Sequence, residues 1–371
     1  MPALTRIPVT KRSGPKTPLR VVSIGGGTGL STLLSGLKKY SPGAQAGERE
    51  RSPELEITAV VTVSDDGGSS GRLRRDFDIL PPGDIRNCMT ALSEDEHLLS
   101  HLFQYRFKSG RGLKGHSFGN LFLTAMHQIT GDFAQAVKLS SEILAIRGRI
   151  FPATSANIVL EAVLIDGTVV QGESKISRSR RPIELVRLLP DSCEPLPETL
   201  DAIRQADLIT LGPGSLYTSV IPNLLVNGLS EAIYRSPAMK VYFGNLMWQP
   251  GETIEFSASR HVEAIHWHAK RSLIECVVLN TAPIPLTLQK RYARANVHPV
   301  ENDFAKLTKM GVKVVTADLI GEQVTPHRRI RHDPAALARI VIDLANRSRA
   351  HQQKKQTLLS QRPQLQRRRV Q

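Results

Sequence analysis

The segment VVSIGGGTGLSTLLSGLKK at residues 21–39 joins a short apolar run, a glycine-rich turn and a helical pattern of leucines. This order is typical of the first strand–turn–helix unit of a nucleotide-binding α/β fold. Glycines allow close backbone approach, and the N–H groups that start the helix then face an anion. We predict that four residues contact phosphate: Gly26, Gly27, Thr28 and Gly29. The alternative is a turn that binds nothing, because Leu30 replaces the third glycine of the dinucleotide-binding motif.

Strand and helix patterns alternate through most of the chain. Apolar runs that predict further strands recur at 57–63, 207–211, 240–243, 275–279 and 312–316, with helical patterns between many of them. This alternation predicts an α/β fold of the Rossmann-like, doubly wound type with a mostly parallel sheet.

One region breaks the alternation. Two β-type runs at 158–166 and 169–174 are joined by Gly167-Thr168, and a third run follows at 183–189. They predict a small antiparallel insert at about 155–190.

The positive charge of the chain is concentrated at its two ends. Residues 1–20 and 350–371 contain no acid and carry 11 of the 15 net positive charges. We predict a disordered basic arm at 1–20, a nucleotide-binding domain at 21–349 that closes with a helix at 333–347, and a disordered basic tail at 350–371. The ends are either solvated or make weak contacts with RNA or an anionic membrane. Specific DNA binding is not expected, because the charge does not form a structured face.

The composition places the chain in a broad class of proteins. No run of about 18 apolar residues predicts a membrane span, and residues 1–20 lack the apolar core of a secretory signal. Cys88, Cys193 and Cys276 are isolated thiols, which suit a reducing compartment. We expect a cytoplasmic protein, and homo-oligomers are common among large α/β proteins of this kind.

A second glycine loop occurs in DLITLGPGSLYTSVIPNLL at 207–225, where a strand leads into a turn and a helix expected to start near Leu216. The carboxyl ends of parallel strands meet at one edge of the sheet, where such folds bind ligands. The pair of loops therefore predicts a ligand with more than one phosphate, or two ligands that meet. The second anion loop comprises Gly212, Gly214, Ser215, Thr218 and Ser219.

An acidic loop follows the run at 57–63. Asp65 and Asp66 can hold Mg²⁺ together with ligand phosphates, or orient the hydroxyls of a ribose. The alternative is an ordinary Ser/Asp/Gly turn.

Two helix starts add polar candidates. In PPGDIRN at 81–87, Asp84 suits an N-cap and Arg86 suits a phosphate clamp. In GHSFGN at 115–120, His116 suits an acid, a base or a cap, and Asn120 suits contact with a sugar or a base.

Nine motifs in order resemble those of the gluconeogenesis-factor (YvcK-type) family, relatives of the 2-phospho-L-lactate transferases (CofD-like). The motifs are GGGTGLS (25–31), VTVSDDGGSSGRLR (61–74), LPPGDIRNC (80–88), LFQYRF (102–107), GHSFGNLF (115–122), TGDFAQA (130–136), RGRIFPAT (147–154), LGPGSLYTSVIPNLL (211–225) and QPGET (249–253). The resemblance runs from about residue 21 to residue 346. Phe118 departs mildly from the expected aliphatic residue.

The resemblance implies a Rossmann-like cytoplasmic protein that binds nucleotides or nucleotide sugars such as UDP-N-acetylglucosamine and controls cell shape and cell-wall precursor supply during gluconeogenic growth. It places phosphates at the glycine loops and a metal near Asp65 and Asp66. It also makes Asn120 and Asn245 candidates for sugar or base contacts. The transferase relatives use Mg²⁺, but the segments GDIRN and GHSFGN follow the regulator branch.

Three functions remain open at this point. A nucleotide-sugar-binding regulator explains two anion loops without an evident nucleophile–base pair. A Mg²⁺-dependent phospholactate-type transferase is the first alternative, because phosphoryl-type transfer needs mainly positioning and charge stabilisation. An NAD-binding oxidoreductase, with Asp65 on the ribose, is the second, although a dehydrogenase does not require the second anion loop.

Overall fold

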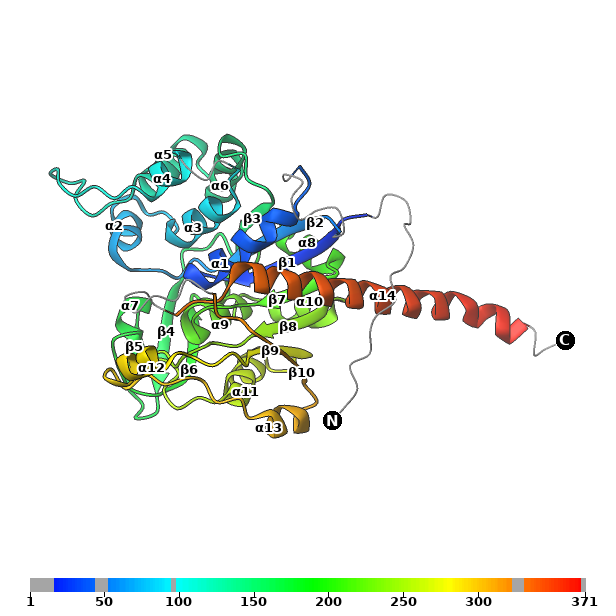
Figure 1. The fold of residues 1–371 in the computed structure, drawn as a ribbon. Coiled ribbons are helices and arrows are strands. Elements are labelled where there is room, and N and C mark those ends of the chain that lie inside the picture. Colours follow the sequence, from blue (N-terminus) through cyan, green and yellow to red (C-terminus); the bar gives the residue numbers. More distant parts are fainter. Residues whose placement is uncertain (1–16, 44–52, 95–97, 322–329, 368–371) are drawn as a thin grey trace.

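The computed structural model describes residues 17–43, 53–94, 98–321 and 330–367. They form a central parallel sheet of seven strands in the order β10-β9-β8-β7-β1-β2-β3, flanked by helices (Figure 1). The strands are β1 (Leu19–Gly25), β2 (Leu55–Val61), β3 (Arg149–Pro152), β7 (Leu208–Leu211), β8 (Met239–Phe243), β9 (Cys276–Asn280) and β10 (Lys313–Ala317). This confirms the predicted α/β fold with a parallel sheet.

The chain order places the two glycine loops side by side. From β1 the chain builds outward through β2 and β3, then returns to the other side of β1 and builds outward again from β7 to β10. In such sheets the point where the strand order reverses is the usual ligand crevice. β1 and β7 pair directly, with Ile24 opposite Leu211, so the loops that follow them begin at neighbouring positions.

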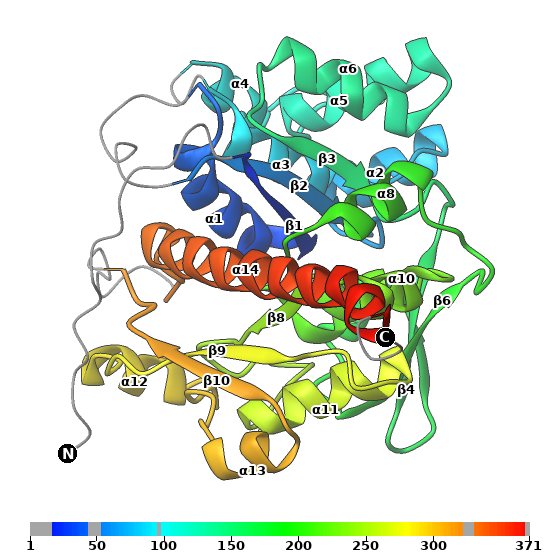
Figure 2. The same cartoon turned by 90° about the vertical axis from the view of Figure 1, so that its right-hand side faces the viewer.

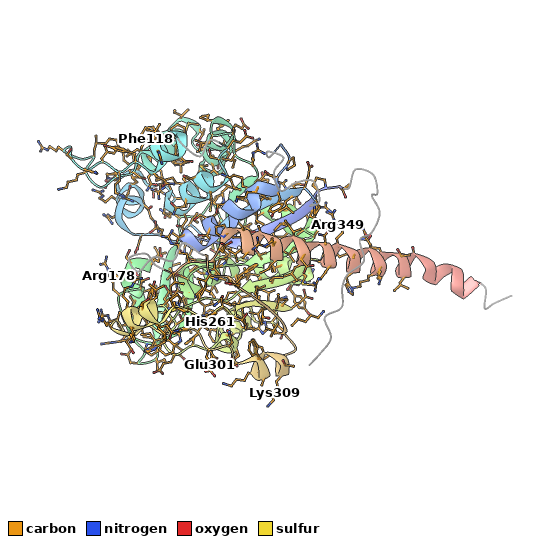
Figure 3. All side chains as sticks on the ribbon, in the orientation of Figure 1. Phe118, Arg178, His261, Glu301, Lys309 and Arg349 are labelled. Atoms are coloured by element: carbon orange, nitrogen blue, oxygen red, sulfur yellow. The ribbon has the colours of Figure 1, made fainter. Side chains whose placement is uncertain are left out.

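The helices that follow β1 and β2 come from the first half of the chain. They are α1 (Gly27–Leu37) with the short turn η1 (Lys38–Tyr40), α2 (Gly68–Phe77), α3 (Gly83–Leu92), α4 (Leu98–Gln104), α5 (Phe118–Thr130) and α6 (Phe133–Ile143). The last five gather at one end of the molecule (Figure 1), and Phe118 marks the start of α5 there (Figure 3). Residues 85–146 are mainly helical.

The predicted antiparallel insert is confirmed as a three-stranded sheet in the order β5-β4-β6. Its strands are β4 (Val159–Leu164), β5 (Val169–Gln171) and β6 (Ile183–Leu189). The short helix α7 (Glu173–Ile176) lies between β5 and β6 in the chain.

The second half of the chain supplies the remaining helices. They are α8 (Pro197–Gln205), the π-type turn η2 (Leu216–Val220), α9 (Ile221–Leu224), α10 (Leu229–Arg235), α11 (Ala258–Ala269), α12 (Leu286–Ala293), α13 (Phe304–Lys309) and α14 (Pro334–Arg367). The first part of α14 crosses one face of the sheet beside α1 (Figure 2). Central strands are therefore covered by helices, and Val21, Ile24 and Leu208 are fully buried.

Two expectations from the sequence differ from the structure. The segment after the run at 57–63 was expected to be an acidic loop, but α2 begins within it at Gly68, where glycine tolerates the positive φ of 48°. The edge strand β3 was not predicted because it has only four residues.

The C-terminal prediction also needs correction. The closing helix does not end at Arg347 but continues to Arg367, so a disordered tail from residue 350 is wrong for the described residues. Lys, Gln, Leu and Arg are good helix formers and prolong the helix without burial. The guanidinium of Arg349 holds the buried carboxylate of Asp207 as α14 leaves the body (Figure 3). Residues 1–16 of the predicted arm lie outside the described residues, and Leu19 and Arg20 already belong to β1.

No helix in the described part of the chain has the length and apolar character needed to cross a bilayer.

The close approach of α1 and α14 gives a stability prediction. A methyl group on Gly36 would overlap the backbone carbonyl of Pro334, which cannot move without displacing α14. We expect Gly36→Ala to reduce the free energy of unfolding by about 1–3 kcal/mol, the usual cost of overpacking. Urea denaturation followed by circular dichroism measures this, with Ser35→Ala as the neighbouring control. Equal stability of Gly36→Ala and the wild type would contradict this packing.

Candidate functional site

The two glycine loops line one cavity of about 530 Å³ at the carboxyl ends of the central strands. The structure therefore brings together most of the residues predicted from the two loops, together with Asn245. The predicted residues on the cavity wall are Gly26, Gly27, Thr28, Gly29, Gly214, Ser215, Ser219 and Asn245. Two predicted members do not line it: Gly212 forms the turn with a φ of 72°, and Thr218 is buried beneath.

The two loops touch through their backbones. A side chain on Gly29 would overlap the carbonyl of Pro213 in the second loop. A side chain on Gly26 would collide with the side chains of Thr62 and Asp84 and lie close to that of Ser219. The glycines at these two positions are thus needed for close approach inside the protein as well as for any ligand.

A carboxylate that the sequence did not indicate occupies the start of the second helix. Glu252 accepts hydrogen bonds from the backbone N–H of Tyr217 and the hydroxyl of Thr218, both at 3.1 Å. Its side chain is buried, and burial raises its pKa to about 7 despite these hydrogen bonds. The second loop therefore already holds an internal anion at the place where a free anion was predicted to bind.

The first loop has the same arrangement. Asp84 was predicted to cap α3, which is wrong: Pro82 holds the N-cap position, and Asp84 lies in the first turn of the helix. The backbone N–H of Gly27 donates a hydrogen bond to the Asp84 carboxyl. Burial, followed by the negative charge of Asp65, raises the pKa of Asp84 to about 7.

The acidic loop lies next to these carboxylates. Asp65 accepts from the backbone N–H of Gly67 at 2.8 Å, and Asp66 accepts from that of Ser174, also at 2.8 Å. Helix α7 of the insert adds Glu173, whose pKa is raised to about 9 by burial and then by the charges of Asp65 and Asp84. The sequence pattern gave no signal for Glu173, because the insert brings it in from about 100 residues away.

No group of three or more histidines, cysteines or carboxylates in the described ranges is arranged to hold a metal ion. Any cation here would depend on one or two carboxylates together with oxygens of a ligand.

Arg86, His116 and Asn120 lie together, but in a different network. Arg86 donates to Ser117 at 2.6 Å and to the side-chain oxygen of Asn120 at 3.0 Å. The amide of Asn120 donates in turn to Ser69 at 3.2 Å, and Ser69 pairs with Nδ1 of His116 at 3.0 Å. Burial, followed by the charge of Arg72, lowers the pKa of His116, which favours its neutral form. This network braces α2, α3 and α5, and none of its members lines the main cavity.

Amide side chains organise the rim of the cavity. Asn245 donates to Gln249 at 2.9 Å, and Gln249 donates to the hydroxyl of Ser215 at 2.8 Å. Gln249 thus connects the segment after β8 to the second glycine loop.

The far wall of the cavity comes from parts of the chain to which the sequence analysis assigned no role. Trp248, Tyr292, Arg331 and His332 all line it. The hydroxyl of Tyr292 accepts from the backbone N–H of Ile330 at 2.9 Å and so positions the segment that carries Arg331. Burial lowers the pKa of His332 to about 4, so it is neutral at pH 7. No motif spacing indicated these residues, because the fold gathers them from three separate segments.

The matches to known proteins span the part of the chain that forms the main sheet and both glycine loops. The family model described as 2-phospho-L-lactate transferase CofD matches residues 21–320. The chain is 46% identical to the gluconeogenesis factor of Bacillus subtilis (strain 168) over 327 residues, covering 88% of this chain and 98% of that protein. It is 47% identical over 330 residues to a putative gluconeogenesis factor of Nostoc sp., covering 89% and 68% respectively. A crystal structure of a Bacillus halodurans protein of the UPF0052 family aligns with a TM-score of 0.81 at 45% identity, covering 88% of this chain and 99% of that chain.

The Asp84 carboxyl generates a pH prediction. Its pKa in the folded state, about 7, lies above the ordinary value near 3.8, so the folded protein binds the proton more tightly than the unfolded chain. This contribution to stability is present below about pH 4 and is lost as the pH rises to 7. Asp84→Asn carries no charge and keeps an acceptor for Gly27. We expect it to be more stable than the wild type at pH 8 by about 4 kcal/mol, and nearly equal at pH 4.

Urea denaturation at pH 4, 6 and 8 tests this expectation. Asp191→Asn, which replaces an exposed carboxylate, is the matched control and should leave the pH dependence of stability unchanged. A wild type and an Asp84→Asn variant with parallel pH profiles would show that Asp84 does not titrate in this way.

Proposed function

We propose that this chain, which belongs to the 2-phospho-L-lactate transferase CofD family, is a cytoplasmic regulator that binds a nucleotide sugar such as UDP-N-acetylglucosamine. In this proposal it adjusts cell shape and cell-wall precursor supply during gluconeogenic growth. The similarity to proteins named gluconeogenesis factor supports the physiological part. The observation that carries the binding part is the single cavity in which both glycine loops face aromatic, amide and arginine side chains.

The cavity suits the parts of such a ligand. Its volume of about 530 Å³ falls within the usual range of small-molecule sites. Backbone N–H groups of the first loop and the guanidinium of Arg331 favour a diphosphate. Trp248 and Tyr292 offer flat surfaces for a base, and Asn245 and Gln249 offer amides for base or sugar hydroxyls.

Several features favour binding without turnover. No serine or threonine on the cavity wall is hydrogen-bonded to a histidine, as far as the described residues go. His332 is neutral, and its Nε2–H donates to the carbonyl of Gly244 at 3.1 Å. A nucleophile activated by an adjacent base is therefore not evident.

The first test compares two glycines with similar backbone conformations. Gly27 lines the cavity with a φ of 61°, and Gly131 has a φ of 71° in open space at the end of α5. Both alanine variants carry the same backbone strain, but only Gly27→Ala places a methyl group in the cavity. We expect Gly27→Ala to weaken UDP-N-acetylglucosamine binding by at least about tenfold, measured by calorimetry, while Gly131→Ala binds like the wild type.

The same titrations include GDP and NAD, and chromatography afterwards determines whether the ligand is intact. Recovery of intact UDP-sugar supports a regulator. Equal affinity of the Gly27→Ala and Gly131→Ala variants, or tight binding of NAD alone, would contradict the proposal.

A second candidate is a Mg²⁺-dependent transferase of phospholactate type. The observation in its favour is that Asp65 raises the pKa of both Asp84 and Glu173 by its negative charge, beside the first glycine loop. A divalent cation would relieve this repulsion, and Mg²⁺ is bound by one or two carboxylates plus phosphate oxygens. Asp65 would hold the ion, which would neutralise the charge of the ligand phosphates. Asp66 is tied to Ser174 through one of its oxygens.

The role of Asp65 is tested by the Mg²⁺ dependence of ligand binding. We expect Mg²⁺ to tighten UDP-N-acetylglucosamine binding to the wild type by at least about fivefold, and Asp65→Asn to lose this effect. Asp191→Asn again serves as the control. Product formation that requires both Mg²⁺ and Asp65 would establish the transferase, whereas an unchanged Mg²⁺ response in Asp65→Asn would exclude Asp65 as the ligand.

We also propose that the protein forms a homo-oligomer. We further propose that its basic ends make weak contacts with RNA or an anionic membrane, which Lys354 and Lys355 on the outer part of α14 support. Such contact would weaken as salt rises.

A further inference from the structure

A second cavity lies on the other side of α1. It has a volume of about 550 Å³ and is bounded by α1, α3, α4 and the segment before α14. We call it the arginine groove, because Arg86, Arg106 and Arg331 line it. The remaining lining residues are Thr28, Ser31, Thr32, Ser35, Lys38, Asn87, Thr90, Ala91, Ser100 and Gln104. None of these described residues carries a carboxylate, in contrast to the main cavity with Glu252.

The positive charges in the arginine groove are not balanced from within it. Burial, followed by the charge of Arg106, lowers the pKa of Arg86, and the carboxylates of Asp84 and Asp65, which lie outside the groove, oppose this shift. Nε of Arg86 is buried without a hydrogen-bond partner among the described residues. Arg106 is exposed and uses one nitrogen for the carbonyl of Gly115 at 2.6 Å. Like charges gathered around a concave surface attract an anion.

Several hydroxyl groups of the groove are already engaged within the protein. Ser31, Thr32 and Thr90 each donate to a backbone carbonyl of their own helix, at 2.7–3.1 Å. The terminal nitrogens of Arg86 also donate within the protein, to the side chains of Ser117, Asn120 and Asn87. The groove therefore recognises a ligand mainly through the guanidinium groups of Arg106 and Arg331. Guanidinium groups match the oxygen geometry of phosphate and carboxylate groups, and they favour such ligands over a neutral sugar.

We propose that the arginine groove is a second binding site, which takes a small metabolite carrying a phosphate or clustered carboxylates. This site is separate from the cavity of the glycine loops. Thr28, Thr32 and Arg331 line both spaces. An anion that draws Arg331 into the groove removes a positive charge from the main cavity. The two ligands therefore oppose each other's binding, and the effect is reciprocal.

Arg106 allows a clean test, because it lines the groove and not the main cavity. Inorganic phosphate and citrate, titrated by calorimetry at constant ionic strength, are the probes for the two ligand chemistries. We expect at least one to bind the wild type, and Arg106→Gln to weaken that binding by at least about tenfold, the effect of losing a charged hydrogen bond. Arg111→Gln removes the same charge from an exposed residue that lines neither space, and should bind the probe like the wild type. Circular dichroism and the melting temperature check that both variants fold.

The Gly27→Ala variant separates the two sites. It should retain the affinity for the probe, because Gly27 does not line the groove. Three results would overturn the proposal. Neither probe binds, or Arg106→Gln and Arg111→Gln change the probe affinity equally, or Gly27→Ala no longer binds the probe. The predicted opposition rests on the proposed nucleotide-sugar binding: the probe should weaken UDP-N-acetylglucosamine binding to the wild type and not to Arg106→Gln. Probe binding itself does not depend on that function.

Discussion

The architecture of the site depends on the contact between two backbones. β1 and β7 are neighbours in the sheet, and the loops that follow them meet where Gly29 faces the carbonyl of Pro213. No side chain fits at that contact. The two loops that meet at this contact also line the main cavity. Main cavity, acidic residues and arginine groove are all arranged around this junction.

Two internal carboxylates distinguish this site from a simple phosphate cradle. Asp84 and Glu252 accept hydrogen bonds from the N–H groups of the first and second loop respectively. Both have pKa values near 7, so the negative charge at the loops changes within the physiological range. Glu252 lines the main cavity, so a phosphate bound there would favour its protonated form or a cation that bridges carboxylate and phosphate.

The sequence predicted the parts of this structure that depend on local pattern. Alternating strands and helices, the antiparallel insert and both glycine loops follow from periodicity and turn chemistry. Glu173 and Arg331 could not be predicted, because only the folded topology brings the insert and residues near 330 to the loops. Asp84 was placed correctly at the start of α3, but it was expected to cap that helix. Capping involves neighbouring residues, whereas the contact of Asp84 with Gly27 joins residues that are far apart in the sequence. The full length of α14 was not predicted, because its outer part has no apolar face.

Helix α14 joins the cavity wall to the outside of the molecule. It begins at Pro334, two residues after His332 in the cavity wall, and rests against Gly36 of α1. At 1.5 Å per residue its 34 residues span about 50 Å, and its outer part extends beyond the sheet (Figure 1). The ion pair between Arg349 and Asp207 holds the helix at the point where it leaves the sheet. The outer part therefore displays the exposed charges of Lys354 and Lys355 at a distance from the ligand cavity.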